Sequence, residues 1–169
     1  LDGKELWKTN LQKRYGEDNL WWDLGTSPVV AEDKVIVAVM QEGEGYLVAL
    51  DAADGKEAWK VDRTYDVPKE NDQSYTTPLV LEQHGAPALV TWGADHLTAH
   101  RASDGELLWS CAGFTPGNAQ YWRTIANPTP GGDLVVVPYG RGGWIAAVKL
   151  GGRGDVTQSH RVWERKGVG

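Results

Sequence analysis

The sequence predicts an all-β fold, built from consecutive antiparallel sheets of four strands each. Three observations carry this prediction: sequence markers that recur at a fixed period, four short apolar runs within each period, and turn residues between those runs. No segment keeps a helical spacing of apolar residues over a dozen positions. The 169 residues include 21 Gly and 9 Trp, a composition typical of many short strands joined by tight turns.

Two independent markers define a period of about 50 residues. The first is a proline that recurs at intervals of 50, as Pro28, Pro78 and Pro128. The second is a tryptophan that recurs at intervals of 52, 50 and 54, as Trp7, Trp59, Trp109 and Trp163. Four antiparallel strands in each period of this length are typical of the blades of a β-propeller.

In chain order, the repeat predicts one extra strand and three complete blades of a single propeller. Residues 1–9 are expected to be the last strand of a preceding blade, followed by complete blades at 26–63 and 76–112. A third blade is expected at 126–166, with an insertion at 151–161. Because known propellers have about 4 to 8 blades, we expect further blades, from the same chain or from other copies, to complete the ring.

The segment 49–59, ALDAADGKEAW, indicates how neighbouring blades are expected to pack. Asp54-Gly55 and Asp104-Gly105 supply the positive φ of a tight turn before the fourth strand. The tryptophan that follows each turn is expected to fill the gap between two blades, because a blade cannot bury both of its faces alone.

These residues resemble a known family. The first copy is similar at every fixed position to the Ala-x-Asp-x-x-x-Gly-Lys-x-x-Trp docking motif of quinoprotein (PQQ-type) propeller repeats, through Ala49, Asp51, Gly55, Lys56 and Trp59. The second copy keeps Ala99, Gly105 and Trp109 but has Arg101 and Glu106 in place of Asp and Lys.

The third copy departs from the motif, because 16 positions separate Ala147 from Trp163 where 10 separate the corresponding residues of the other copies. Its insertion resembles a segment of bacterial PQQ-like propellers described as BamB-like. The resemblance implies a protein of the bacterial envelope, either periplasmic, associated with the outer membrane, or secreted.

The resemblance also raises the question of a cofactor. Enzymatic members of the family bind PQQ and calcium, with a catalytic Asp, metal-binding Glu and Asn, a stacking Trp and usually two adjacent cysteines. Cys111 is the one cysteine here, so the adjacent pair is missing and no catalytic residue can be assigned. We therefore expect no enzyme activity, metal or cofactor in this chain, with PQQ and calcium expected only if it is part of a dehydrogenase.

Candidate binding residues lie in the loops that precede the first strand of each blade, because these loops rim one face of the central channel. Aromatic and polar residues gather at the same place in the three loops: Trp21, Trp22, Asp23, Asn71, Asp72, Gln73, Tyr121, Trp122 and Arg123. Such residues are typical of a surface that binds a protein or a glycan. The alternative is that Trp22 and Trp122 only fill the wide end of the channel.

Composition and spacing argue against other functions. A net charge of -6 disfavours nucleic-acid binding, which needs clustered Lys and Arg. The longest apolar run, 35–40, is far shorter than the roughly 20 residues that span a membrane. His96 and His100 would lie roughly 13 Å apart on a strand, too far for one metal. The predicted function is therefore a non-catalytic scaffold or binding module, with a dehydrogenase fragment or the sensor domain of a membrane kinase as alternatives.

Overall fold

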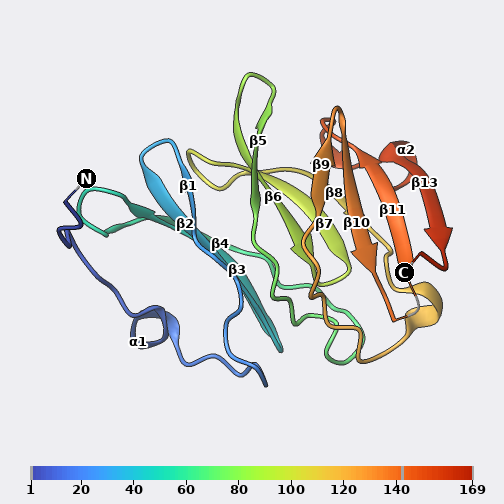
Figure 1. Cartoon of the computed structure of the whole chain (residues 1–169), viewed down its shortest axis with the longest axis horizontal. Coiled ribbons are helices and arrows are strands. Elements are labelled where there is room, and N and C mark those ends of the chain that lie inside the picture. The colour runs from blue at the N-terminus through green and yellow to red at the C-terminus, as the bar shows by residue number, and fades with distance from the viewer. Residues whose placement is uncertain (1, 142, 169) are drawn as a thin grey trace.

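The computed structural model describes residues 2–141 and 143–168 and consists of three sheets that lie side by side (Figure 1). The first sheet contains β1 (Val29–Ala31), β2 (Lys34–Gln41), β3 (Glu44–Asp51) and β4 (Glu57–Asp62). The second contains β5 (Leu79–Gln83), β6 (Ala86–Gly93), β7 (His96–Arg101) and β8 (Leu107–Ala112). The third contains β9 (Thr129–Gly131), β10 (Leu134–Tyr139), β11 (Trp144–Lys149) and β13 (Arg161–Lys166).

Within each sheet, these four strands pair in sequence order and antiparallel. This arrangement confirms the all-β class and the three consecutive four-stranded sheets, which we call blades 1, 2 and 3. The middle strands of blade 2 are buried on both faces, because consecutive residues at 88–93 of β6 and 97–100 of β7 are all buried. Burial on both faces requires cover from both sides, and neighbouring blades provide it.

Two tryptophans of the repeat, Trp7 and Trp59, pack on a turn of the following blade. The indole N–H of Trp7 donates to the carbonyl of Ala52 over 2.8 Å, and that of Trp59 donates to the carbonyl of Ala102 over 3.1 Å. Gly55 and Gly105 have φ values of 72° and 78°, and a Cβ at either position would lie 2.8 Å from the indole packed on it. Glycine is therefore required twice, for the turn conformation and for close contact with the ring.

The polar residues of the motif stabilise the turn rather than the interface. An Asp51 carboxylate oxygen accepts from the amide of Ala53 over 2.7 Å, and exposed Lys56 pairs with Asp54 over 2.6 Å. In the second copy, Arg101 pairs with Asp104 and Glu106 in the same turn, over 2.6 and 2.5 Å. The turn thus keeps an ion pair although the residues that supply it have changed.

The third repeat differs because its insertion crosses to blade 2. Residues Gly154–Asp155 form β12, which pairs in parallel with the outer strand β8, and the short helix α2 (Thr157–His160) follows. Blade 2 gains a fifth strand in this way, and the insertion fastens blade 3 to the outer edge of blade 2. Trp109 on β8, which is fully buried, donates its indole N–H to the side chain of Gln83 in its own blade over 2.7 Å.

The N-terminal segment corrects one sequence prediction. Residues 2–9 form no strand, and Leu1 lies outside the described residues. A strand needs a hydrogen-bonded neighbour, and no described strand pairs with this segment. A short helix α1 (Leu11–Tyr15) follows, capped by the side chain of Asn10. Side chains of the segment, Trp7 among them, instead cover an apolar face of blade 1 that includes Val39 and Val48.

Candidate functional site

The candidate site is built by the loops that lead into the first strand of each blade. These loops, which we call the rim loops, comprise residues 16–28, 63–78 and 113–128. Equivalent residues of neighbouring loops contact each other one period apart. Thr26 donates its hydroxyl to the carbonyl of Thr76 over 2.9 Å, and the amide of Thr77 donates to the side chain of Asn127 over 2.9 Å. The repeat itself therefore holds the rim loops in register.

The second and third rim loops run alongside each other in parallel. Ser74 and Thr124 form a parallel bridge, in which the amide of Tyr75 donates to Thr124 over 2.9 Å and the amide of Thr124 donates to Gln73 over 3.0 Å. The side chain of Asn71 accepts from the amide of Trp122 over 2.8 Å. These contacts place the two predicted clusters, 71–73 and 121–123, side by side.

Several predicted site residues are used within the fold. Gln73 is 3% exposed and accepts from the Nε of Arg123 over 2.9 Å. Arg123 also forms a salt bridge of 2.6 Å with Glu70. Asp72 accepts from the amide of Gly43 over 2.7 Å, which closes the turn between β2 and β3. These side chains fix the rim loops in place and have few polar groups left for a ligand.

The aromatic residues predicted as binding contacts are more accessible, except Trp122. Trp21 and Trp22 are 75% and 70% exposed and contact each other edge to face at 6.3 Å, and Asp23 beside them is also exposed. Tyr121 is 45% exposed. Trp122, in contrast, is half-buried, and its ring packs closely on the turn between β10 and β11. The predicted indoles therefore differ: Trp21 and Trp22 are exposed on the first rim loop, whereas Trp122 on the third rim loop is packed against blade 3.

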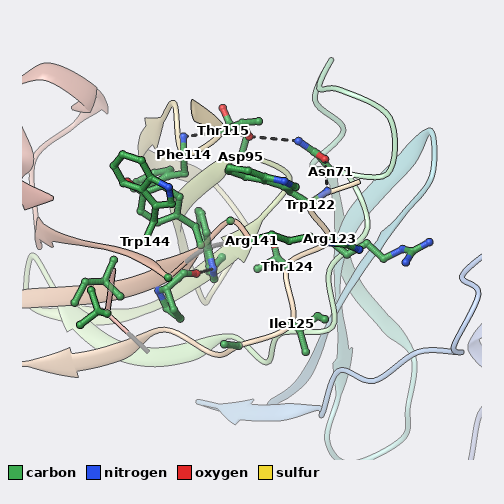
Figure 2. A pocket seen from close by; sticks show the side chains of 18 residues that line it. Asn71, Asp95, Phe114, Thr115, Trp122, Arg123, Thr124, Ile125, Arg141 and Trp144 are labelled. Carbon is green, nitrogen blue, oxygen red and sulfur yellow. Dashed lines mark hydrogen bonds between the residues drawn. The ribbon is translucent and has the colours of Figure 1, made fainter. Parts of the chain in front are cut away.

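Trp122 lines a pocket of about 280 Å³ between blades 2 and 3 (Figure 2). The pocket extends from the third rim loop to the turn at Asp95 and to residues 138–141 and 143–145. Aromatic rings form much of its wall, and Figure 2 shows the indole of Trp122 extending toward Trp144 beneath Asp95 and Thr115. Cations also line it, through Arg123 and Arg141. Sequence reasoning missed Asp95, Arg141 and Trp144 because no local pattern shows that turns of two blades meet there.

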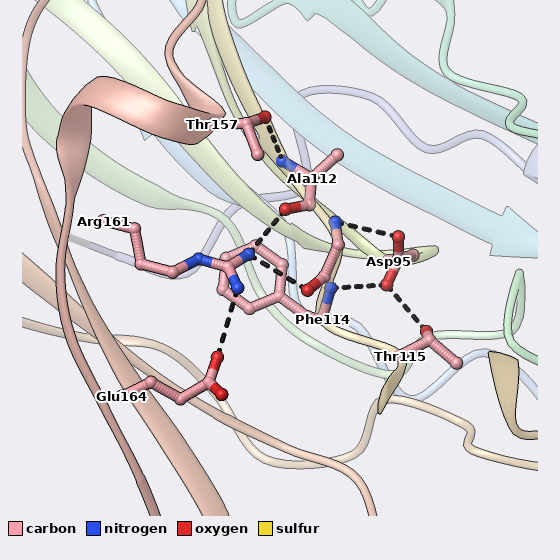
Figure 3. A network of polar contacts seen from close by, with 8 residues as sticks. Asp95, Ala112, Phe114, Thr115, Thr157, Arg161 and Glu164 are labelled. Atoms are coloured by element: carbon pink, nitrogen blue, oxygen red, sulfur yellow. Dashed lines mark hydrogen bonds and ion pairs between the residues drawn. The ribbon is translucent and has the colours of Figure 1, made fainter. Parts of the chain in front are cut away.

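A polar network supports the back of this pocket (Figure 3). The carboxylate of Asp95 accepts from the amides of Gly113 and Phe114, over 3.0 and 2.6 Å, and from the hydroxyl of Thr115 over 2.6 Å. Arg161 donates to the carbonyls of Ala112 and Gly113 and lies 4.3 Å above the ring of Phe114. The network fixes the start of the third rim loop against blade 3.

Electrostatic conditions around the pocket do not indicate a reactive group. Burial raises the pKa of the Cys111 thiol, so it is a poor nucleophile at neutral pH. Burial also raises the pKa of the Tyr139 phenol, which stays neutral. Within residues 2–141 and 143–168, no three His, Cys, Asp or Glu side chains lie together as metal ligands.

The described residues do not fit the calcium ion that accompanies PQQ in enzymatic members of the family. Calcium requires several oxygen ligands at one point, whereas Asp72, Glu70 and Asp95 are each engaged with a different protein partner. The amide of Asn71 is likewise used within the loops, donating to the carbonyl of Ala119 over 2.8 Å. No helix of the described residues, whether α1, α2 or the short 3-10 helix η1 (Pro116–Asn118), is long and apolar enough to cross a membrane.

The blades and their docking tryptophans define a PQQ-type propeller, and the family comparison agrees. The chain belongs to the PQQ-like repeat family described as outer membrane protein assembly factor BamB, whose model matches residues 1–166. None of the curated proteins compared with the sequence is a significant match.

Solved structures show the same fold at low sequence identity. BamB from Moraxella catarrhalis is 17% identical with a TM-score of 0.51, and 84% of this chain covers 36% of it. Quinohemoprotein alcohol dehydrogenase from Comamonas testosteroni is 19% identical with a TM-score of 0.59, and 83% of this chain covers 20% of it. A europium-containing methanol dehydrogenase is 18% identical with a TM-score of 0.53, and 82% of this chain covers 24% of it. The chain thus spans about a fifth to a third of these proteins.

Proposed function

We propose that the chain is part of a non-catalytic propeller of the bacterial envelope, which binds a protein or a glycan through its rim loops. The exposure of Trp21 and Trp22, at 75% and 70%, is the observation that carries this proposal. Large exposed indoles are costly in water and are enriched at the centre of protein interfaces. They also present flat apolar faces on which sugar rings stack. The family membership supports an envelope location and a scaffold role.

Photo-crosslinking in the living bacterium tests the proposal. A photoreactive phenylalanine at position 22 of the protein is expected to capture one defined envelope partner, and Trp21→Ala is expected to abolish that capture. Leu6→Ala is a matched control, because Leu6 is 76% exposed and lies outside the rim loops. Titration of the purified protein with chito-oligosaccharides, followed by tryptophan fluorescence, tests the glycan alternative. If Trp21→Ala keeps both the crosslink and the fluorescence response to the oligosaccharides, a binding role for these indoles is contradicted.

A second candidate is that the chain belongs to a quinoprotein dehydrogenase. Solved quinoprotein dehydrogenases share the fold at the same low sequence identity as BamB, 18–19% against 17%, so the fold is compatible with either class. Since the described residues do not provide the ligands of a calcium ion, the active site would have to lie in other blades. Dye reduction by the protein with PQQ, calcium and a primary alcohol separates the two candidates, and we expect no reduction.

A further inference from the structure

We propose that the pocket between blades 2 and 3 binds a carboxylate carried next to an apolar or aromatic group, as in an acidic peptide segment of a partner. The site goes beyond the function proposed above because it does not involve Trp21 or Trp22. Its volume of about 280 Å³ is close to the lower limit of ligand sites in proteins. The pocket therefore accepts one or two side chains rather than a folded surface.

The walls of the pocket select an apolar or aromatic group. Trp92, Phe114 and Tyr139 form a contiguous set of rings, with centroids 4.9 Å apart for the first two and 5.4 Å for the last two. Trp144 stacks on Tyr139 at 5.9 Å, and Trp122 packs against Gly140 on the same turn. Aromatic walls of this kind contribute most of the affinity in small pockets.

The distribution of charge selects an anion over a cation. Faces of two rings already carry cations, because Arg161 lies over Phe114 at 4.3 Å and Lys166 lies over Trp144 at 5.4 Å. A cationic ligand would meet these groups and Arg141, so the rings cannot serve as a cage for a positive charge.

The acidic groups near the pocket are turned toward protein donors. Asp95 accepts three hydrogen bonds from residues 113–115, and Glu70 forms its salt bridge with Arg123. Exposed Arg141 and Lys166 form no ion pair with any carboxylate of the described residues. Glu164, which lies beside Tyr139, is likewise paired with Arg161 over 3.1 Å. The pocket mouth therefore carries two cations without a carboxylate partner among the described residues, in a chain whose net charge is -6.

Calorimetric titration of the protein with defined probes tests this site. The probes are acetyl-Phe-Glu-Leu-Glu-amide, its neutral counterpart acetyl-Phe-Gln-Leu-Gln-amide, and phenylacetate. We expect the acidic peptide to bind about tenfold more tightly than the neutral one at low salt, and the difference to shrink as salt rises. Arg141→Gln should weaken acidic-peptide binding about threefold to fivefold. Arg165→Gln is the matched control, because Arg165 is an exposed cation one residue from Lys166 and points to the opposite face of the strand, and it should leave binding unchanged.

Each outcome decides the proposal. If phenylacetate binds and the acidic peptide does not, the carboxylate site is supported and its ligand is a small free acid. Equal binding of both peptides, equal effects of Arg141→Gln and Arg165→Gln, or binding of none of the probes would each overturn it. Trp21→Ala separates this site from the rim-loop proposal, because it should leave peptide binding intact even where it abolishes crosslinking.

Discussion

The two gaps between the three blades are filled in different ways, although the same repeat builds both. In the gap between blades 1 and 2, the residue after β4 is Arg63, which is 2% exposed. Its guanidinium donates to the hydroxyl of Thr98 over 3.0 Å and to the carbonyls of Gly93 and His96 over 3.1 and 2.8 Å. Burial lowers its pKa to about 10, so it remains charged at neutral pH.

In the gap between blades 2 and 3, Gly113 and Phe114 follow the corresponding strand. Phe114 is 2% exposed and contacts rings of both blades, but it has no polar group to reach the far side of the gap. A pocket remains beside it. The two gaps thus differ at the position after the fourth strand, where Arg63 reaches across the first gap with hydrogen bonds and Gly113 has no side chain to reach across the second.

The largest effect is expected from removing the buried cation. Arg63→Met should lower the free energy of unfolding by about 3–5 kcal/mol, because the carbonyls of Thr91, Gly93 and His96 and the hydroxyl of Thr98 would lose this donor in a buried site. Urea denaturation measures this loss. Arg141→Met, an exposed position at the other gap, should change stability by less than about 0.5 kcal/mol. Equal losses in the two variants would show that Arg63 does not hold its gap closed.

Truncating a docking tryptophan is expected to be nearly as costly. Trp59→Ala should lower the free energy of unfolding by about 3 kcal/mol, because it leaves a cavity against Gly105 and removes the hydrogen bond to Ala102. Trp21→Ala, at an exposed indole, is the control. Unchanged stability in Trp59→Ala would show that the tryptophan of the repeat does not join the blades.

The first gap should also be sensitive to acid. Burial, the main cause, and the charge of Arg63 lower the pKa of His100 to about 4. The folded state therefore favours neutral His100, and this stabilisation is complete above the unfolded pKa of about 6.5 and is lost as the pH falls toward 4. Acidification should therefore lower the free energy of unfolding by on the order of 2–3 kcal/mol through this group, and this decrease should be absent in His100→Phe. Unfolding midpoints that fall equally in both proteins would assign the acid sensitivity to other groups.

The smallest effects are expected in the rim loops. Trp122→Ala should cost about 1–2 kcal/mol because its ring is half-buried against Gly140, whereas Trp22→Ala should stay within about 0.5 kcal/mol. Thermal unfolding of the two variants measures the difference. If both variants unfold like the parent protein, Trp122 is not a structural wall of the pocket.

The repeat could be predicted from the sequence because its physical requirements are local. A tight turn needs Asp-Gly, and the gap between blades needs a large flat ring a fixed distance later, so the signal recurs every 50 residues. The structure of 151–160 could not be predicted in the same way, because β12 pairs with a strand about 45 residues earlier and its two residues carry no periodic pattern.

The candidate site was predicted only in part for a related reason. Exposure of Trp21 and Trp22 agrees with their position in a polar loop, but the sequence does not show that Gln73 and Arg123 satisfy each other across two loops. The buried role of Arg63 was also missed, because an isolated arginine before a loop resembles a solvated residue. Such pairs depend on the distance between blades, which the three-dimensional fold alone sets.

The most direct test of the difference between the two gaps uses the indole N–H signals of the nine tryptophans in ¹H–¹⁵N spectra. During titration with the acidic peptide, the signals of Trp92, Trp122 and Trp144 should shift. Those of Trp7 and Trp59, which fill closed positions, should stay in place. Shifts of equal size at Trp59, or no shift at the three pocket indoles, would contradict the account that only the second gap is open to a ligand.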